Sequence, residues 1–201
     1  MYKSKSLYII NEIQIIDSFQ EFLRDIETLT YASYMNELID ISCLEEESNE
    51  ELFKLLITSY YLLKHDVGDN QVLIYSYELR VLKYTGYNLN LDYCSICGKN
   101  ILTSNYFNFS YYGGVCNECK KSHGIYISFS AYNTINTLIK FPIEKFYRIK
   151  INSNVKEEIA KILSELINQC YQKIPKSLKM LNYIKEASKN EWDILRKNRY
   201  Y

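Results

Sequence analysis

Apolar side chains recur every three or four residues over most of the chain, a spacing that places them on one face of an α-helix. The first run begins at Phe19 and continues to Ile39, and the acidic loop 44–51 follows it. Ser48 and Glu51 have the spacing of a capping box, so a second helix is expected to begin there and to end before Gly68. Four further helices are expected, at 71–84, 130–139, 154–174 and 176–187.

Several boundaries of these helices are expected from single residues. Gly86 is placed where the helix 71–84 needs a left-handed cap. The side chains of Ser130 and Asn154 are expected to cap the next two helices. Pro142 and Pro175 each stop the helix that precedes them, because proline cannot continue a helix.

Residues 6–16, "SLYIINEIQII", show a different pattern, with β-branched and aromatic residues in partial alternation. This pattern predicts a strand or one arm of a hairpin, without an obvious partner. The whole chain has only 6 Gly and 2 Pro residues, which favours long helices over a β fold rich in turns. The predicted fold class is therefore mainly α.

The charge is divided unevenly although the net charge is zero. Residues 1–70 hold 5 basic and 14 acidic residues, a net charge of −9, and residues 71–201 hold the balancing +9. The basic half would attract nucleic acid or an acidic peptide, although a charge excess of this kind is usually solvated surface. No apolar run approaches the length of a membrane span and no secretory leader is evident, so we expect a cytoplasmic protein without a membrane partner.

Four of the six cysteines form two pairs with the same spacing. "YCSICGKN" and "VCNECK" place two CxxC turns 18 residues apart, and two such turns complete a tetrahedral four-thiolate shell suited to Zn²⁺. Gly98 permits the first turn, and Gly113 with Gly114 is expected to reverse a hairpin between the pairs. The prediction is a zinc ribbon with a closed, structural metal site whose ligands are Cys94, Cys97, Cys116 and Cys119.

The cysteines and histidines also allow other interpretations. Iron in the same shell is the main alternative to zinc, whereas a redox dithiol needs no second CxxC and a disulfide is disfavoured without secretion. Cys43 and Cys170 lie on apolar helical faces and are expected in the core. His123 is a substitute ligand of low weight, and His65 is expected to interact with a helix dipole. No phosphate loop, dinucleotide fingerprint or hydrolase motif occurs, so an enzyme is not expected.

Residues 77–100, "YELRVLKYTGYNLNLDYCSICGKN", resemble the C-terminal part of the RecO family of bacterial recombination mediators and DNA repair proteins. The shared pattern is an aromatic-Glu-Leu helix, a Gly-Tyr turn and a CxxCG knuckle. "FSYYGGVCNEC", "YASYMNELID", "LFKLLITSYYLL" and "IPKSLKML" extend the resemblance over nearly the whole chain. The residues that match the pattern are Tyr77, Glu78, Leu79, Gly86, Tyr87, Cys94, Cys97 and Gly98.

The resemblance implies a division of the chain. Family members begin with an OB-fold barrel, and here only "YKSKSLYIINEIQIIDSF", similar to the last strand of that barrel, precedes the first helix. Residues 1–16 are therefore expected to be a remnant of the N-terminal OB-fold. Residues 17–92 and 129–201 form the expected helical domain, with 93–128 as the inserted zinc ribbon.

The resemblance also implies a non-enzymatic role in gap repair. RecO-like proteins dock on the C-terminal tail of single-strand-binding protein, act with RecR, help RecA load and anneal strands. An apolar slot beside cations suits such a tail, and Leu79, Arg80 and Lys83 combine an apolar side chain with two cations. The alternative interpretation, that these residues simply belong to an ordinary amphipathic helix, has at least equal weight. Single-stranded DNA is expected to bind weakly without the barrel.

Two other classes of function remain open at this point. A general zinc-ribbon module would bind nucleic acid directly through the basic half, with a steep dependence on salt. A metal-dependent or redox enzyme would need an open metal position or an accessible thiol of low pKa. The basic residues expected to bind nucleic acid are Lys145, Arg148, Lys150, Lys173, Lys176 and Lys179.

Overall fold

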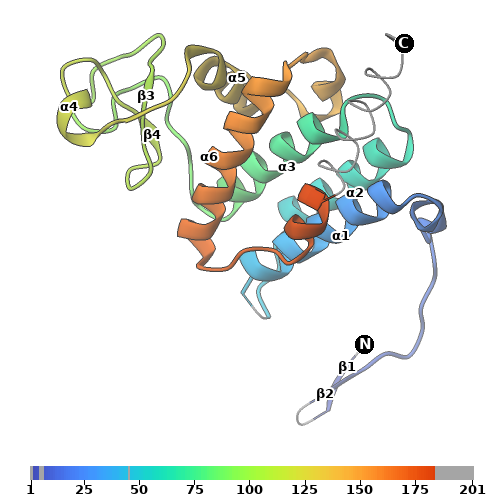
Figure 1. Cartoon of the computed structure of the whole chain (residues 1–201). Coiled ribbons are helices and arrows are strands. Elements are labelled where there is room, and N and C mark those ends of the chain that lie inside the picture. Colours follow the sequence, from blue (N-terminus) through green and yellow to red (C-terminus); the bar gives the residue numbers. More distant parts are fainter. Residues whose placement is uncertain (1, 5–6, 45, 184–201) are drawn as a thin grey trace, which may run out of the picture.

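The computed structural model of the chain describes residues 2–4, 7–44 and 46–183. This part of the chain is mainly helical and carries one small three-stranded sheet that projects from the helices (Figure 1). The predicted fold class is confirmed. Within the described ranges, no helix combines the length and the apolar character needed to cross a bilayer.

Among the residues that the structure describes, five long helices form the body of the molecule. Their bounds are α1 Ile26–Ser42, α2 Glu50–Lys64, α3 Asn70–Tyr84, α5 Phe129–Lys140 and α6 Ser153–Tyr171. Two short 3₁₀ helices, η1 Gln20–Arg24 and η2 Ile143–Arg148, pack against them. Helical backbone resumes at 177–183, where Leu181 is buried; Ile184, which was also expected to face inward, lies outside the described residues.

The central element is α3, which contacts α1, α2, α5, α6 and η2. Ten of its fifteen residues are buried, because neighbours cover it on nearly every side. Two buried tyrosine hydroxyls form hydrogen bonds between α3 and α1. Tyr77 of α3 donates to the Met35 carbonyl of α1 at 2.9 Å, and Tyr34 of α1 donates to the Glu78 carboxylate of α3. Buried polar groups need such partners. Both apolar and polar contacts therefore hold α3 against the neighbouring helices.

Three predicted caps are displaced by one or two residues. Asn49, and not Ser48, caps α2 by accepting from the Leu52 amide at 3.0 Å. Ser128 caps α5 in place of Ser130, and Asn152 caps α6 in place of Asn154. In each case a second residue able to cap lies nearby, and the packed apolar face selects which one begins the helix. The left-handed Gly86 after α3 is confirmed, with φ 95°.

The first helical run is interrupted where a continuous helix was predicted. Asp25 has extended backbone between η1 and α1, and its carboxylate accepts from the Thr28 amide at 2.7 Å. Apolar spacing continues across this break because the buried Phe22 of η1 still faces the bundle. The prediction of one helix from residue 19 was therefore wrong.

The predicted N-terminal strand is shorter than expected and has a partner. Strand β2 spans only Leu7–Ile9 and pairs antiparallel with β1, Tyr2–Ser4. Residues 10–16 have no regular structure, and Ile13, Ile15 and Ile16 are highly exposed. Without a covering sheet, their alternation does not form a longer strand.

The segment between α3 and α5 forms the small sheet. Strand β3, Tyr106–Asn108, lies between β4, Gly113–Gly114, and β5, Ile125–Tyr126, and both pairings are antiparallel. The glycines lie in β4 rather than in the turn, and Tyr112 takes the positive φ of 49° that reverses the chain. The short helix α4, Lys120–His123, connects β4 to β5. We call residues 93–128 the ribbon.

Candidate metal centre and its attachment to the helices

The four predicted cysteines converge in the ribbon. The Sγ atoms of Cys94, Cys97, Cys116 and Cys119 all lie within 4.8 Å of one another. Cys94 and Cys116 are buried, Cys119 is half-buried and Cys97 is exposed, so the cluster lies at the edge of the ribbon. Residues that are 22 positions apart in the sequence thus present sulfur to one point.

The first CxxC turn is closed by backbone hydrogen bonds. The Cys94 amide donates to the Lys99 carbonyl at 2.7 Å, and the Gly98 amide donates to the Cys94 carbonyl at 2.9 Å. Gly98 has φ 73°, a left-handed conformation that a residue with a Cβ rarely adopts. The predicted role of this glycine is confirmed, because the turn leaves both sulfurs on the same side.

Backbone N–H groups stabilise the negative charge of a cysteine thiolate in the cluster. Burial alone would raise the pKa of the Cys94 thiol, but N–H groups of Cys116, Cys97 and Ile96 directed at its sulfur lower that pKa to about 6. The Cys116 amide lies 3.3 Å from Cys94 Sγ. Burial and the neighbouring sulfurs instead raise the pKa of the Cys119 thiol to about 12, because thiolates held together disfavour further ionisation. A central cation would remove that repulsion.

The donor set fits a divalent zinc ion. With sulfur about 2.3 Å from zinc, a tetrahedron places its sulfurs about 3.8 Å apart. The Sγ atoms of Cys97 and Cys116 are 3.7 Å apart. Four thiolates would complete the coordination shell, and the ion would stabilise the fold of the ribbon rather than present an open coordination position.

The remaining cysteines and histidines lie away from this cluster. Cys43 and Cys170 are half-buried and pack against the edge of the hydrophobic core, so their predicted core positions are confirmed only in part. The backbone carbonyl of His123 accepts from Asn108 Nδ2 at 2.6 Å, and the residue is exposed. His65 is the C-terminal cap residue of α2, at the helix end where it was predicted.

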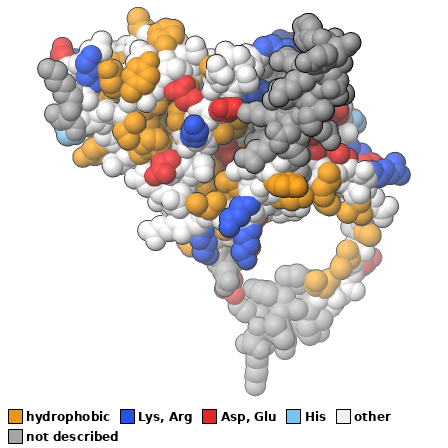
Figure 2. Space-filling model, viewed as in Figure 1, with side chains coloured by type: hydrophobic (Ala, Val, Ile, Leu, Met, Phe, Trp, Pro, Cys, Tyr) orange, Lys and Arg blue, Asp and Glu red, His pale blue; other side chains and the backbone are white. Residues whose placement is uncertain are grey.

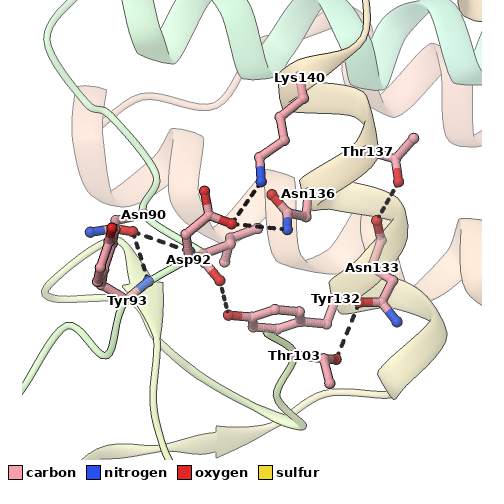
Figure 3. A network of polar contacts seen from close by, with 10 residues as sticks. Asn90, Asp92, Tyr93, Thr103, Tyr132, Asn133, Asn136, Thr137 and Lys140 are labelled. Atoms are coloured by element: carbon pink, nitrogen blue, oxygen red, sulfur yellow. Dashed lines mark hydrogen bonds and ion pairs between the residues drawn. The ribbon is translucent and has the colours of Figure 1, made fainter. Parts of the chain in front are cut away.

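A polar network joins the approach to the ribbon with α5 (Figure 3). Asp92 accepts from Lys140 Nζ at 2.6 Å and from Asn136 Nδ2 at 3.5 Å. One turn nearer the start of α5, Thr103 donates to Asn133 Oδ1 at 3.2 Å. Sequence reasoning missed these residues, because no local pattern pairs positions 92 and 140.

A steric contact reinforces this attachment. A Cβ on Gly114 would lie 2.0 Å from the Tyr132 hydroxyl oxygen and 2.8 Å from Ile101 Cδ1. Only glycine therefore lets β4 approach α5 so closely. Phe107 and Val115 are fully buried and belong to the same hydrophobic cluster as the helices, so the described side chains of the ribbon share one core with the helical body.

The residues predicted to dock a partner tail are divided between interior and surface. Leu79 is buried at 3% exposure, and the Arg80 guanidinium donates to the carbonyls of Ser76 at 2.8 Å and of Phe141. Burial lowers the pKa of Arg80. Lys83, at the end of α3, is exposed.

The residues predicted to bind nucleic acid form two groups. Lys145 and Arg148 belong to η2 and Lys150 follows it, whereas Lys173, Lys176 and Lys179 follow α6; all six are exposed. Figure 2 shows basic side chains gathered on the lower part of one face, in the region of the segment that follows α6. The structure thus places these cations on the surface, in separate parts of the chain.

Comparison with known proteins gives consistent matches over most of the chain. A family model described as "Recombination protein O C terminal" matches residues 23–179. A relative from Clostridium acetobutylicum named "DNA repair protein RecO" is 54% identical over 185 residues, which cover 92% of this chain and 75% of the relative. Relatives of the same name from Clostridium novyi and Clostridium kluyveri are 47% and 44% identical, each over 95% of this chain and over 75% and 74% of the relative.

Proposed function

Because the chain belongs to the RecO family of DNA repair proteins, we propose that it acts in the cytoplasm as a non-enzymatic mediator of recombinational gap repair. In this role it docks on single-strand-binding protein, acts with RecR, and promotes RecA loading and strand annealing. The observation that carries the proposal is the family match over residues 23–179 together with the four-cysteine cluster of the ribbon.

We assign Zn²⁺ to the cluster as a structural ion held by Cys94, Cys97, Cys116 and Cys119. The ribbon has only three short strands and one short helix, so it forms few regular hydrogen bonds of its own. A metal that binds the folded form alone stabilises that form by its binding free energy. The ion would keep the ribbon attached to α5 during partner binding.

Docking of the acidic tail of single-strand-binding protein is proposed at the exposed end of α3. Lys83 would contact the tail carboxylates there, while Leu79 and Arg80 hold α3 against its neighbours from inside. The negative end of α3 stabilises the ammonium group of Lys83 in the free protein, and this ammonium group would supply the positive charge that pairs with the tail carboxylates. This places the docking surface beside the chain segment that leads into the ribbon.

Fluorescence anisotropy of labelled single-stranded DNA tests this function. The chain is titrated onto the naked strand, onto the strand coated with single-strand-binding protein, and onto the strand coated with that protein lacking its acidic tail. Binding only to the strand coated with the intact protein is the expected result. Lys83→Ala should weaken it, whereas Lys54→Ala, an exposed lysine on α2 that pairs with Glu50, should not.

A second candidate function is supported by the exposure of all six predicted basic residues. A nucleic-acid module would bind the naked strand tightly and lose affinity steeply as salt rises. Replacing Lys173, Lys176 and Lys179 together with Gln would then reduce the salt slope by about 2, because each phosphate contact on a single strand contributes about 0.7. Such a result would overturn tail docking as the main activity.

A further inference from the structure

A cleft of about 500 Å³ opens where the ends of four helices meet, apart from the four-cysteine cluster. The last residues of three helices line it: Cys43 follows α1, Thr85 follows α3, and Tyr171 ends α6. The beginning of α2 and the loop before it complete the walls. The lining includes none of the four clustered cysteines and no residue of α5.

The electrostatics of the cleft favour a cation. Each helix C-terminus carries the equivalent of roughly half a negative charge, and three such ends converge here. The N-terminal end of α2, capped by Asn49, also lines the cleft and offsets about one of these half charges, whereas the carboxylate of Glu47 adds a negative charge to the walls. Among the described residues that line the cleft, none is Lys, Arg or His.

Aromatic rings add a preference for an organic cation. Tyr84, Tyr87 and Tyr171 line the cleft, and the rings of Tyr87 and Tyr171 meet edge to face with centroids 5.7 Å apart. The Tyr171 hydroxyl is held 2.6 Å from Thr85 Oγ1. Ring faces attract cations, and hydroxyl oxygens accept from N–H groups. A guanidinium group uses both, because it is planar, weakly hydrated and rich in donors.

We propose that this cleft binds an arginine side chain presented by a partner protein. Leu44 lies at the wall with 70% exposure, beside the exposed Glu47, and offers apolar contact to the residues that flank an arginine in a polypeptide. A hydrated metal ion would gain nothing from Leu44 or from the tyrosine rings. The proposal depends neither on the metal centre nor on the docking of an acidic tail, since it requires the opposite charge in the partner.

Nuclear magnetic resonance titration of the isotope-labelled full chain tests the proposal. The probe is a peptide of glycine and serine with one central arginine, and the control peptide has citrulline, the neutral analogue of the same shape, at that position. The arginine peptide should cause saturable shifts at the amides of Cys43, Thr85 and Tyr171, with at least about fivefold tighter binding than the citrulline peptide. Equal binding of both peptides, or shifts confined to other regions, would overturn it.

Two variants that each remove one negative charge distinguish binding in the cleft from general attraction to the acidic residues of the N-terminal half. Glu47→Gln should weaken binding of the arginine peptide about threefold, as expected for an exposed charge pair. Glu51→Gln, on the exposed side of α2 and outside the cleft, should leave the affinity unchanged. An equal loss in both variants would mean that net charge attracts the peptide, and a lysine peptide that bound as tightly as the arginine peptide would remove the assignment to a guanidinium.

Discussion

The hydroxyl of Tyr132 in α5 donates a 2.7 Å hydrogen bond to the backbone carbonyl of Leu91, three residues before the first cysteine of the cluster. Tyr132 is fully buried and Leu91 is 3% exposed, so water does not replace this bond easily. The bond therefore fixes the direction in which the chain leaves the helical body toward the four-cysteine cluster.

Removal of this hydroxyl should destabilise the protein measurably. Tyr132→Phe leaves the Leu91 carbonyl buried without its partner, and we expect a loss of about 1–3 kcal/mol in the free energy of unfolding. Urea denaturation followed by circular dichroism measures it. Tyr126→Phe is the matched control, since Tyr126 is 66% exposed, and it should change stability little. Equal stability of both variants would show that the bond contributes nothing.

The sequence predicted which four cysteines converge, because the geometry of each pair is local. A CxxC turn fixes two sulfurs within four residues, and Gly98 supplies the left-handed backbone that the turn requires. Gly86 was equally predictable, since a glycine after a helical run marks the left-handed cap. Features that depend on three or four consecutive residues were therefore accessible from the sequence.

Features set by tertiary packing were not accessible in the same way. The break at Asp25 leaves the apolar spacing intact, so periodicity alone could not reveal it. Choosing Asn49 over Ser48 as a cap requires knowing which helical register fills the core. The pairing of Asp92 with Lys140 joins residues 48 positions apart, and neither residue carries a distinctive local signal.

Loss of one cysteine should release the metal while the helices persist. Cys94→Ser or Cys116→Ser removes a buried thiolate from the proposed shell, and we expect the bound zinc, measured by atomic emission after gel filtration, to fall from one ion per chain to well below it. Helical circular dichroism should largely remain, because α1, α2 and α3 do not contribute ligands. Cys43→Ser is the control and should keep full metal content. Unchanged zinc in the Cys94 and Cys116 variants would contradict the assignment.

The start of α1 should show a dependence on pH through its cap. Hydrogen bonds from the Thr28 hydroxyl and amide hold the pKa of Asp25 below its usual value. A lowered pKa in the folded state means that the stabilisation is present above the unfolded value of about 3.9 and is lost as the pH falls through the lower folded value. Asp25→Ala should therefore cost about 1 kcal/mol at pH 7 and much less near pH 2.

Asp25→Asn provides the comparison for this cap. Asparagine keeps an oxygen that accepts from the Thr28 amide but does not titrate, so this variant should retain most of the stability at pH 7. Urea unfolding at pH 7, 4 and 2 measures both variants against the unaltered protein. A constant difference between Asp25→Ala and the unaltered protein over this range would mean that the carboxylate charge does not contribute to the cap.

The close approach of β4 to α5 predicts a coupling between two substitutions. Gly114→Ala should destabilise the protein by about 1–3 kcal/mol, because its methyl group would meet the buried Tyr132 hydroxyl and Ile101. Combined with Tyr132→Phe, the same alanine meets a ring without the hydroxyl, so the nearest clash disappears. The double variant should therefore be more stable than the sum of the single losses predicts, by about 1 kcal/mol.

Ser110→Ala, at an exposed position of the β3–β4 turn, should combine additively with Tyr132→Phe. Strict additivity for Gly114→Ala as well would mean that β4 shifts to accommodate the methyl group, and that the ribbon is held to α5 by the hydrogen bonds of Figure 3 rather than by close packing.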